Sequence, residues 1–419
     1  MSSQIVLKGW VERVRELGGL KFFILRNKDG VTQVTLKKGV VKDELFDLTG
    51  QLHREDCLIV KGELKDAKQA PGGREVVPDS IEVVNKADVP LPIELGETNK
   101  DKRLDYRYMD LRDPKILAVF KVRADVLRLV REYFTKEGFF EVQTPVIQAA
   151  GAEGGSELFP LIYYGKEAFL RQSPQLYKQM LMASGLDKIW EVGSTFRAER
   201  SHTRKHVSEI TMVDSEIAWV ESEEDAMKAV EGLVHHVLKE ISKNCKDQLE
   251  LLGVKVKVPD LPFPRLHYDE VLEMLQKTDA GKHLKWGDDF ADAEERVVGE
   301  IMEKKGHELY FFTKYPSQIK PFYIMMDGKY SRGFDLDFKG MEITSGGQRE
   351  HRYDVLTKVM KSKGLDPHKF EFYLNAFKIG MPKHSGFGLG LDRLVQQILN
   401  LPDIKEVILF PRTVERLVP

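Results

Sequence analysis

Cationic side chains are concentrated in one short segment between two runs of residues that alternate as strands do. The segment FRAERSHTRKHVSE, residues 196–209, contains Arg197, Arg200, His202, Arg204, Lys205 and His206. A cationic loop between two strands can surround a polyphosphate, because guanidinium groups donate paired, charge-assisted hydrogen bonds to phosphate oxygens. A solvated hairpin loop is the alternative, and it is the commoner structure of such a run of charges.

Acidic side chains interrupt a later strand-like run, FDLDFKGMEITSGGQREH, residues 334–351. Asp335 and Asp337 share one face of a strand, and Glu342 joins them only if a bulge or a turn at Lys339 and Gly340 shifts the alternation. Converging carboxylates suit Mg²⁺, which prefers a few protein oxygens together with substrate phosphates. A polar edge strand is the alternative interpretation.

Two further segments place polar groups near the start of predicted helices. In GFGLGLDRLVQQIL, residues 386–399, Arg393 stands in the first helical turns, where a positive charge opposes the helix dipole and suggests that it binds an anion. In AFLRQSPQLYKQMLM, residues 168–182, Ser173, Gln175 and Lys178 lie at a strand-to-helix junction that could bind a small zwitterion. An ordinary capped helix is the alternative there.

The elements that must position these residues alternate irregularly from about residue 114 onward. A long amphipathic helix is predicted from Pro114 to Phe140, with Gly138 as its stop. Strand-like runs dominate the polar segments without the strict alternation of a doubly wound parallel sheet, so we predict an α+β domain built on an antiparallel sheet. The sequence contains no GxxxxGK[ST] motif, and GFGLG lacks the downstream context of a dinucleotide-binding fingerprint.

The N-terminal region has a different pattern. Residues 5–84 contain five strand-like runs separated by turn signals, of which Asp29-Gly30 is the clearest, and a helical stretch from Val41 to Leu52 follows the third run. This order fits a small Greek-key barrel of the oligonucleotide-binding kind, the OB-fold. Another small barrel without a ligand fits equally well. The stretch from 87 to 114, rich in proline and charge, is predicted as a hinge.

The composition is that of an ordinary folded protein of 419 residues, 42% hydrophobic and 31% charged. It excludes disordered, collagen-like and disulfide-rich chains, and the length predicts two or three domains. Cys57 and Cys245 belong to no metal-binding or redox motif and are expected to be reduced thiols. Because no leader-like start or long apolar run is found, we expect a soluble cytoplasmic protein without membrane contact. The net charge of -2 means that local patches must bind any nucleic acid.

Taken together and in this order, the segments resemble the three signature motifs of class II aminoacyl-tRNA synthetases, and most closely the aspartyl enzymes of the archaeal type. Motif 1 resembles the long helix with GFFEVQTPVI (about 118–147), motif 2 the run from FRAE to SEIAW (about 190–220), and motif 3 GFGLGLDRLVQQIL (about 384–412). GAEGGSELFP, 151–160, is similar to the family's flipping loop. The resemblance implies an anticodon-binding domain over 1–86, a hinge over 87–114, a catalytic domain over 115–419, and a homodimer formed through motif 1.

The resemblance also implies how ATP is bound and attacked. Arg197 and Arg393 would be catalytic: Arg197 would bridge the α-phosphate and the attacking carboxylate, and Arg393 would bind the γ-phosphate with His206. Asp335 and Glu342 would bind Mg²⁺. The residues implied to contact ATP are Arg197, Glu199, His206, Glu342 and Arg393, with Glu199 facing adenine.

A pocket for L-aspartate is implied in the same way. Lys178 and Arg349 would bind the β-carboxylate, a pairing that favours an anion and leaves two buried cations uncompensated when neutral asparagine binds. The remaining members, around the α-ammonium group, would be Ser173, Gln175, Asp214 and, in the flipping loop, Glu153.

Three residues of the barrel, Phe22, Gln33 and Glu75, fall where the family stacks and hydrogen-bonds the anticodon bases. The alternative for Phe22 is a core position, because it and Phe23 must face opposite sides of a strand and one of them must be buried.

Two further positions bear on which tRNA is used. Enzymes of this type that are restricted to tRNA-Asp typically carry a Trp and a Lys where this chain has Glu12 and Pro71. Glutamate offers no aromatic face and proline no donor, so neither reproduces the contacts that favour C over U at the third anticodon base. The resemblance therefore implies a non-discriminating enzyme for tRNA-Asp and tRNA-Asn, with an amidotransferase to convert the misacylated product.

The resulting hypothesis is an ATP-dependent ligase that attaches L-aspartate to tRNA through an aspartyl-adenylate. Within the same fold, the alternatives are an asparaginyl-tRNA synthetase, a strictly discriminating aspartyl enzyme and a tRNA-independent asparagine-forming relative. Lys178 argues against the first and the third. A catalytically silent RNA-binding paralogue is the alternative from another class. The residues that argue against it are Arg197, Asp335, Glu342 and Arg393.

Overall fold

The computed structural model describes residues 3–149, 158–198 and 205–419. The chain divides into two compact units, Met1–Leu117 and Ala118–Pro419, each with a core of its own.

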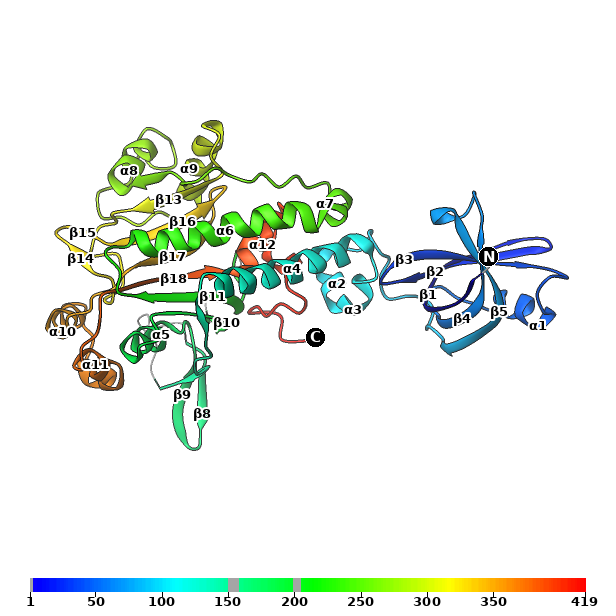
Figure 1. Ribbon diagram of the computed structural model, residues 1–419, viewed down its shortest axis with the longest axis horizontal. Helices are drawn as coiled ribbons and strands as arrows, with labels where there is room; N and C mark the ends of the chain where they lie inside the picture. Colours follow the sequence, from blue (N-terminus) through cyan, green and yellow to red (C-terminus); the bar gives the residue numbers. More distant parts are fainter. Residues whose placement is uncertain (1–2, 150–157, 199–204) are drawn as a thin grey trace. The chain divides into compact units, whose positions relative to one another are not determined.

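The first unit is built around a closed barrel with the strand order β1-β2-β3-β5-β4 (Figure 1). Its strands are β1 (Ser3–Leu17), β2 (Leu20–Asn27), β3 (Gly30–Lys37), β4 (Cys57–Asp66) and β5 (Arg74–Asn85). The helix α1 (Asp43–Thr49) follows β3, and the 3₁₀ turn η1 (Pro71–Gly73) precedes β5. The predicted OB-fold with a helix after its third strand is confirmed.

Alternation along the strands decides which side chains fill the barrel. Phe23 and Leu25 are 1% and 2% exposed and pack with Val34, whereas Phe22 is half-buried on the opposite face of β2. Of the two neighbouring phenylalanines, Phe23 is therefore the core residue.

The stretch expected to be a hinge contains two short helices, α2 (Lys100–Asp105) and α3 (Arg107–Asp110), and belongs to the first unit. Arg107 is fully buried, and its Nη1 donates to Asp110 at 2.8 Å. Arg112 Nη1 donates to Glu55 of the barrel unit at 2.6 Å. The charges of this stretch thus form a buried and a partly buried ion pair, which composition alone did not indicate.

The second unit is built on an eight-stranded sheet with the order β12-β13-β16-β17-β18-β11-β10-β6. Its strands are β6 (Phe140–Glu141), β10 (Lys188–Phe196), β11 (Glu209–Ala218), β12 (Arg265–His267), β13 (Leu309–Thr313), β16 (Gly333–Phe338), β17 (Glu342–Gln348) and β18 (His384–Gly390). Neighbours are antiparallel except for the two edge pairs, β12 with β13 and β6 with β10. The predicted α+β fold on an antiparallel sheet is confirmed, with short parallel strands added at both edges.

Two long helices, α4 (Pro114–Lys136) and α6 (Glu224–Asn244), lie side by side across the sheet (Figure 1). Tyr133 of α4 donates its hydroxyl to the carbonyl oxygen of Ala229 in α6 at 3.1 Å. Their apolar sides pack against the sheet in the main core of the unit. The predicted helix begins at Pro114 as expected, ends at Lys136, and is followed by Gly138 with a φ of 75°.

The other elements of this unit are shorter. The strands are β7 (Ile147–Gln148), β8 (Pro160–Tyr163), β9 (Lys166–Leu170), β14 (Met326–Asp327) and β15 (Tyr330–Ser331). The helices are α5 (Gln175–Leu181), α7 (Lys246–Leu252), α8 (Tyr268–Gln276), α9 (Asp292–Lys304), α10 (Tyr353–Ser362), α11 (Glu371–Phe377) and α12 (Leu391–Ile398), with 3₁₀ turns η2 (Met182–Ser184), η3 (Pro367–Phe370) and η4 (Ile404–Val407). Within the described part of the chain, no helix is long and apolar enough to cross a membrane.

The barrel core yields a test with a matched pair of variants. Phe23→Ala should destabilise the barrel by about 3–5 kcal/mol, because it leaves a cavity in a filled core. Phe22→Ala should cost about 1 kcal/mol or less, because its ring is partly in solvent. Hydrogen exchange of barrel amides in the full-length chain measures both. Equal losses for the two variants would contradict the assignment of Phe23 to the core.

Candidate active site

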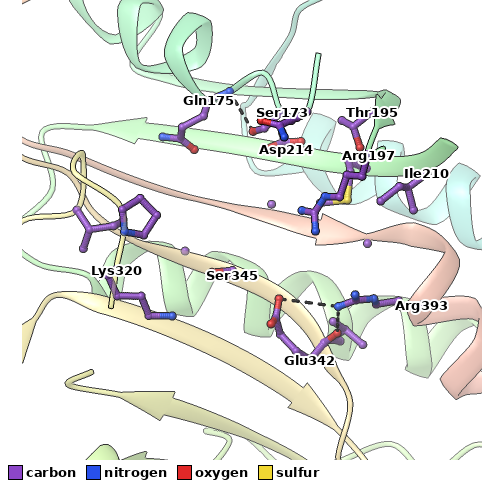
Figure 2. A pocket seen from close by; sticks show the side chains of 18 of the residues that line it. Ser173, Gln175, Thr195, Arg197, Ile210, Asp214, Lys320, Glu342, Ser345 and Arg393 are labelled. Atoms are coloured by element: carbon purple, nitrogen blue, oxygen red, sulfur yellow. Dashed lines mark hydrogen bonds and ion pairs between the residues drawn. The ribbon is translucent and has the colours of Figure 1, made fainter. Parts of the chain in front are cut away.

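A cavity of about 390 Å³ lies against the large sheet of the second unit (Figure 2). Strands β10, β11, β17 and β18 and helices α5, α9 and α12 contribute to its lining. The residues selected from the sequence that line it are Ser173, Gln175, Lys178, Arg197, His206, Asp214, Glu342, Arg349 and Arg393. Side chains more than 200 positions apart in the chain are thus brought into one cavity.

Two selected residues, Glu153 and Glu199, lie outside the described residues, as do Arg200, His202 and Arg204 of the cationic loop. The strands expected on either side of that loop are present, since β10 and β11 pair antiparallel from Lys188–Ile217 to Phe196–Glu209. At the described end of the loop, Lys205 lines the cavity, and its Nζ donates to Glu295 of α9 at 2.8 Å.

Lys178 is a buried cation held by several acceptors. The residue is 2% exposed. Its Nζ lies 2.9 Å from Asp214 Oδ1, 3.0 Å from the carbonyl oxygen of Phe387 and 3.7 Å from Glu216 Oε2. Charge and hydrogen bonds together compensate the loss of hydration that burial imposes on an ammonium group.

Arg349 is the second buried cation, and Glu216 is its partner. The guanidinium Nε and Nη2 donate to the two carboxylate oxygens of Glu216 at 2.9 and 3.2 Å. Burial favours a raised pKa for Glu216, but Arg349 and then Lys178 outweigh it, so the pKa of this carboxyl lies below its ordinary value. The two cations that the resemblance places on the β-carboxylate thus have carboxylate partners within the protein, Asp214 for Lys178 and Glu216 for Arg349.

The glycines of β18 make room for these carboxylates. A Cβ atom added at Gly386 would lie 2.5 Å from Cδ of Glu216, and one at Gly388 would lie 3.1 Å from Asp214 Oδ1. A Cβ at Gly390 would meet nothing closer than 3.6 Å. Because β18 pairs with β11 residue by residue, side chains on this face of β18 would occupy the space of the two acids.

The acidic residues of β16 and β17 share a face, as the sequence required. Asp337 is paired with Glu342 and Asp335 with Ser345, and the register shifts at Ile343. The chain reverses between the two strands at Lys339 and Gly340, whose φ angles are 51° and 71°. The bulge and the turn together supply the phase shift that brings Glu342 to the side of Asp335 and Asp337.

Burial and mutual repulsion raise the pKa values of two members of this acidic group. The pKa of Glu342 is raised, first by burial and then by Asp335, and the pKa of Asp337 is raised well above its ordinary value by burial and by Glu295 and Glu342. Lys320 Nζ donates to Asp335 Oδ2 at 2.6 Å. Asp335 itself lies beside the cavity and is not part of the lining.

The carboxylates of Asp335 and Glu342 fit Mg²⁺ better than a metal held by protein alone. Among the described residues, no group of three or more metal-binding side chains is arranged to hold an ion. Mg²⁺ commonly takes one or two carboxylates and completes its shell with phosphate and water oxygens. Within the described structure, Asp335 Oδ1 is buried without a hydrogen-bond partner, which leaves it available as such a ligand.

Arg393 reaches the same part of the cavity from α12. Its Nη1 donates to the carbonyl oxygen of Glu342 at 2.9 Å and lies 3.9 Å from Glu342 Oε1 (Figure 2). The next residue back, Asp392, accepts from Arg123 of α4 at 2.5 Å and from the backbone N–H of Thr211 at 2.8 Å. These contacts fix the start of α12, so the Arg393 guanidinium is directed toward the acidic strands.

Sequence reasoning missed Glu216, Gln179 and His384, all buried behind the cavity. Glu216 could have been found, since it stands two residues after Asp214 on one strand and so shares its face. Gln179 and His384 gave no signal, because their contact joins segments 205 positions apart.

A second polar group lies on the outer face of the barrel in the first unit. Gln33 Nε2 and Thr35 Oγ1 both donate to Glu75 Oε2, at 3.1 and 2.6 Å. Phe22 is paired with Thr35 across β2 and β3, so its ring lies on the same face. The three barrel residues selected from the sequence, Phe22, Gln33 and Glu75, thus form one continuous surface.

The two positions expected to affect the choice of tRNA, Glu12 and Pro71, lie at irregular points of the barrel backbone. Glu12 stands at a bulge in β1, and its Oε2 lies 3.8 Å from Nη1 of Arg26, which also donates to both oxygens of Glu55 at 2.7 Å. Pro71 is the first residue of η1.

Comparisons with known proteins agree with this architecture. A family described as tRNA synthetases class II (D, K and N) matches residues 99–414, and an OB-fold nucleic acid binding domain matches residues 5–84. The chain is 47% identical to the aspartate–tRNA(Asp) ligase of Pyrococcus abyssi and 44% identical to the aspartate–tRNA(Asp/Asn) ligase of Archaeoglobus fulgidus, covering 99% of this chain and 96% of each relative. The crystal structure of asparaginyl-tRNA synthetase from Pyrococcus horikoshii with asparaginyl-adenylate is similar at a TM-score of 0.93 and 36% identity, over 100% of this chain and 96% of that one.

The chain therefore belongs to the class II tRNA synthetases of the D, K and N group. It is an aminoacyl-tRNA ligase whose first unit is a tRNA-binding OB-fold domain. The resemblance drawn from the sequence motifs is confirmed.

The glycines of β18 provide a graded test. Gly386→Ala should destabilise the second unit by about 2–3 kcal/mol, because the new methyl group overpacks against the Glu216 carboxylate and the carbonyl oxygen of Ser215. Gly388→Ala should cost about 1 kcal/mol, and Gly390→Ala should change stability by less than about 0.5 kcal/mol. Denaturant-induced unfolding measures the series. The same loss in all three variants would show that the carboxylates do not determine the need for glycine.

Proposed function

We propose that this enzyme activates L-aspartate with ATP and transfers it to tRNA-Asp and also to tRNA-Asn. The observation that carries the choice of amino acid is the pair of buried cations, Lys178 and Arg349, in the cavity. The relatives from Pyrococcus abyssi and Archaeoglobus fulgidus are both named as aspartate–tRNA ligases.

The first half-reaction needs positioning and charge stabilisation more than proton transfer. The α-carboxylate of aspartate, already ionised at neutral pH, attacks the α-phosphorus of ATP, and pyrophosphate leaves. Arg197 would bridge the attacking carboxylate and the α-phosphate, and His206 and Arg393 would bind the γ-phosphate. Glu199 would contact adenine. All but Glu199 are described residues of one cavity, which supports these roles.

Asp335 and Glu342 would hold Mg²⁺ on the ATP phosphates. When bound, the ion would neutralise charge that develops on the phosphate oxygens. Arg393 donates its hydrogen bond to the backbone carbonyl oxygen of Glu342 and lies 3.9 Å from Glu342 Oε1, so it would share the carboxylate with the metal rather than occupy it with a hydrogen bond.

Aspartate binding would exchange ion pairs within the pocket. Lys178 now pairs with Asp214, and Arg349 with Glu216. The substrate's α-ammonium group would replace Lys178 at Asp214, with help from Ser173 and Gln175, and Lys178 would turn to the β-carboxylate. Asparagine would displace Lys178 equally but offer it no anion, so the neutral amide would leave one buried charge unpaired.

The alternatives are less well supported. The similar crystal structure of an asparaginyl enzyme is 36% identical to this chain, against 47% for the Pyrococcus abyssi aspartate ligase, and Lys178 argues for an anionic substrate. A silent paralogue would have no use for Arg197 and Arg393 in one cavity with Glu342. A homodimer through motif 1 and a cytoplasmic location are parts of the same proposal.

Aspartate-dependent exchange of pyrophosphate into ATP tests the amino-acid assignment. Lys178→Met should lower kcat/KM for aspartate about a hundredfold, on the order of 3 kcal/mol, because it breaks a buried charge pair. The KM for ATP should change little. Lys188→Met, at an exposed lysine, is the matched control. Exchange with asparagine and none with aspartate would overturn the proposal, and so would a Lys178→Met enzyme within twofold of the wild type.

The barrel surface would bind the anticodon. Phe22 offers an aromatic face for stacking, and Gln33 and Glu75 offer base-edge hydrogen bonds beside it. Glu12 and Pro71 supply neither an aromatic face nor a donor for the third anticodon base. An amidotransferase would then be needed to convert Asp-tRNA-Asn.

Charging transcripts of tRNA-Asp and tRNA-Asn side by side tests the tRNA assignment. We expect kcat/KM values that differ by less than about tenfold, or about 1.4 kcal/mol. Phe22→Ala should weaken both reactions to a similar extent, because stacking is tolerant of sequence. A preference for tRNA-Asp above roughly a hundredfold, about 2.7 kcal/mol, would show a discriminating enzyme.

A further inference from the structure

A chain of buried hydrogen bonds leads from a backbone carbonyl to the wall of the aminoacylation cavity. His384 Nδ1 lies 2.8 Å from the carbonyl oxygen of Pro382, and His384 Nε2 lies 3.1 Å from Nε2 of Gln179. Gln179 Oε1 accepts from Nε2 of Gln175 at 2.9 Å and from the hydroxyl of Tyr373 at 3.2 Å. Gln175 lines the cavity and closes the chain (Figure 2).

At the His384 end, this series of hydrogen bonds can run in only one direction from donor to acceptor. A carbonyl oxygen can only accept, so His384 Nδ1 must carry the proton in the contact with Pro382. His384 is fully buried, and burial lowers its pKa to about 4, which keeps the ring neutral at neutral pH. A neutral ring with its proton on Nδ1 has a lone pair on Nε2, and that atom therefore accepts.

The lone pair on His384 Nε2 fixes the orientation of the Gln179 amide. Its Nε2 donates to His384, so its Oε1 faces the other way and must accept. Tyr373 donates to Oε1, and burial raises the pKa of this phenol well above its ordinary value, so it keeps its proton. Reversing the Gln179 amide would bring two acceptors together at His384 and place donors against Tyr373 and Gln175.

Gln175 is left with one orientation. Its Nε2 donates one of its two hydrogens to Gln179, which fixes the amide with the carbonyl oxygen Oε1 at its opposite end. The side chain is 4% exposed, so it has little water with which to exchange these bonds. An acceptor in this place suits a cationic group, whereas a reversed amide would present N–H groups to it.

We propose that His384, acting through Gln179, is a positioning residue that holds the Gln175 carbonyl oxygen toward the α-ammonium group of the amino-acid substrate. This inference rests on the proposed function, which places that ammonium group beside Gln175, Ser173 and Asp214. His384 and Gln179 themselves do not line the cavity. Their effect is to fix whether the oxygen or the nitrogen of the Gln175 amide, two groups of similar size, faces the cavity.

The kinetic test uses Gln179→Met, which keeps the length of the side chain and removes both hydrogen-bonding groups. Pyrophosphate exchange should show the KM for aspartate raised at least tenfold, with kcat and the KM for ATP within about twofold of the wild type. Gln396→Met is the matched control: Gln396 is 2% exposed in α12, does not line the cavity, and should leave all three constants within twofold. An unchanged KM for aspartate in a folded Gln179→Met enzyme would overturn the proposal.

A spectroscopic test remains decisive even if Gln179→Met fails to fold. The ¹⁵N chemical shifts of the wild-type His384 ring, assigned by their loss in His384→Gln, should show protonated Nδ1 and unprotonated Nε2 at neutral pH. A ring protonated on Nε2, or on both nitrogens, would overturn the direction of the chain. A wild-type enzyme without aspartate-dependent exchange would instead overturn the proposed function, so the two failures are distinct.

Discussion

Two cations and two carboxylates buried side by side are the constraint on which the catalytic unit depends. Lys178, Arg349, Asp214 and Glu216 are each 3% exposed or less. Any one of these charges alone would be strongly destabilising at such depth, and the four are tolerated because each cation has a carboxylate within hydrogen-bond distance. The register of the sheet supplies this arrangement, since Asp214 and Glu216 alternate on β11 opposite the glycines of β18.

The end of the cavity near Arg393 follows the same rule with different partners. Lys320 contacts Asp335, Lys205 contacts Glu295, and Arg393 lies near Glu342. These ion pairs hold the side chains in defined orientations. Preorganised charges stabilise a transition state more effectively than charges that must first reorient, because the reorganisation has already been made during folding. Burial first, and then the neighbouring carboxylates, raise the pKa values of Asp337 and Glu342.

Much of this could be predicted from the sequence because it depends on local patterns. The barrel strands, the long helix from Pro114 and the shared face of Asp335 and Asp337 follow from periodicity and turn residues. The ion pairs of Glu216 and the hydrogen bonds of His384 could not be predicted, because they depend on which strands become neighbours. The ion pairs of Arg107 and Arg112 could not be predicted for a related reason, since a charged, proline-rich stretch has the same composition whether it is packed or solvated.

The pairing of the four buried charges also limits how the protein can evolve. Replacing Lys178 by a neutral residue removes a positive charge but leaves Asp214 without its ion-pair partner, so a lineage that takes this step alone passes through a less stable intermediate. If Lys178 binds the substrate as proposed, a heritable change in the charge of the accepted amino acid therefore needs at least one further substitution that compensates the loss of Lys178. Such epistasis makes the substrate preference of this fold resistant to drift by single mutations.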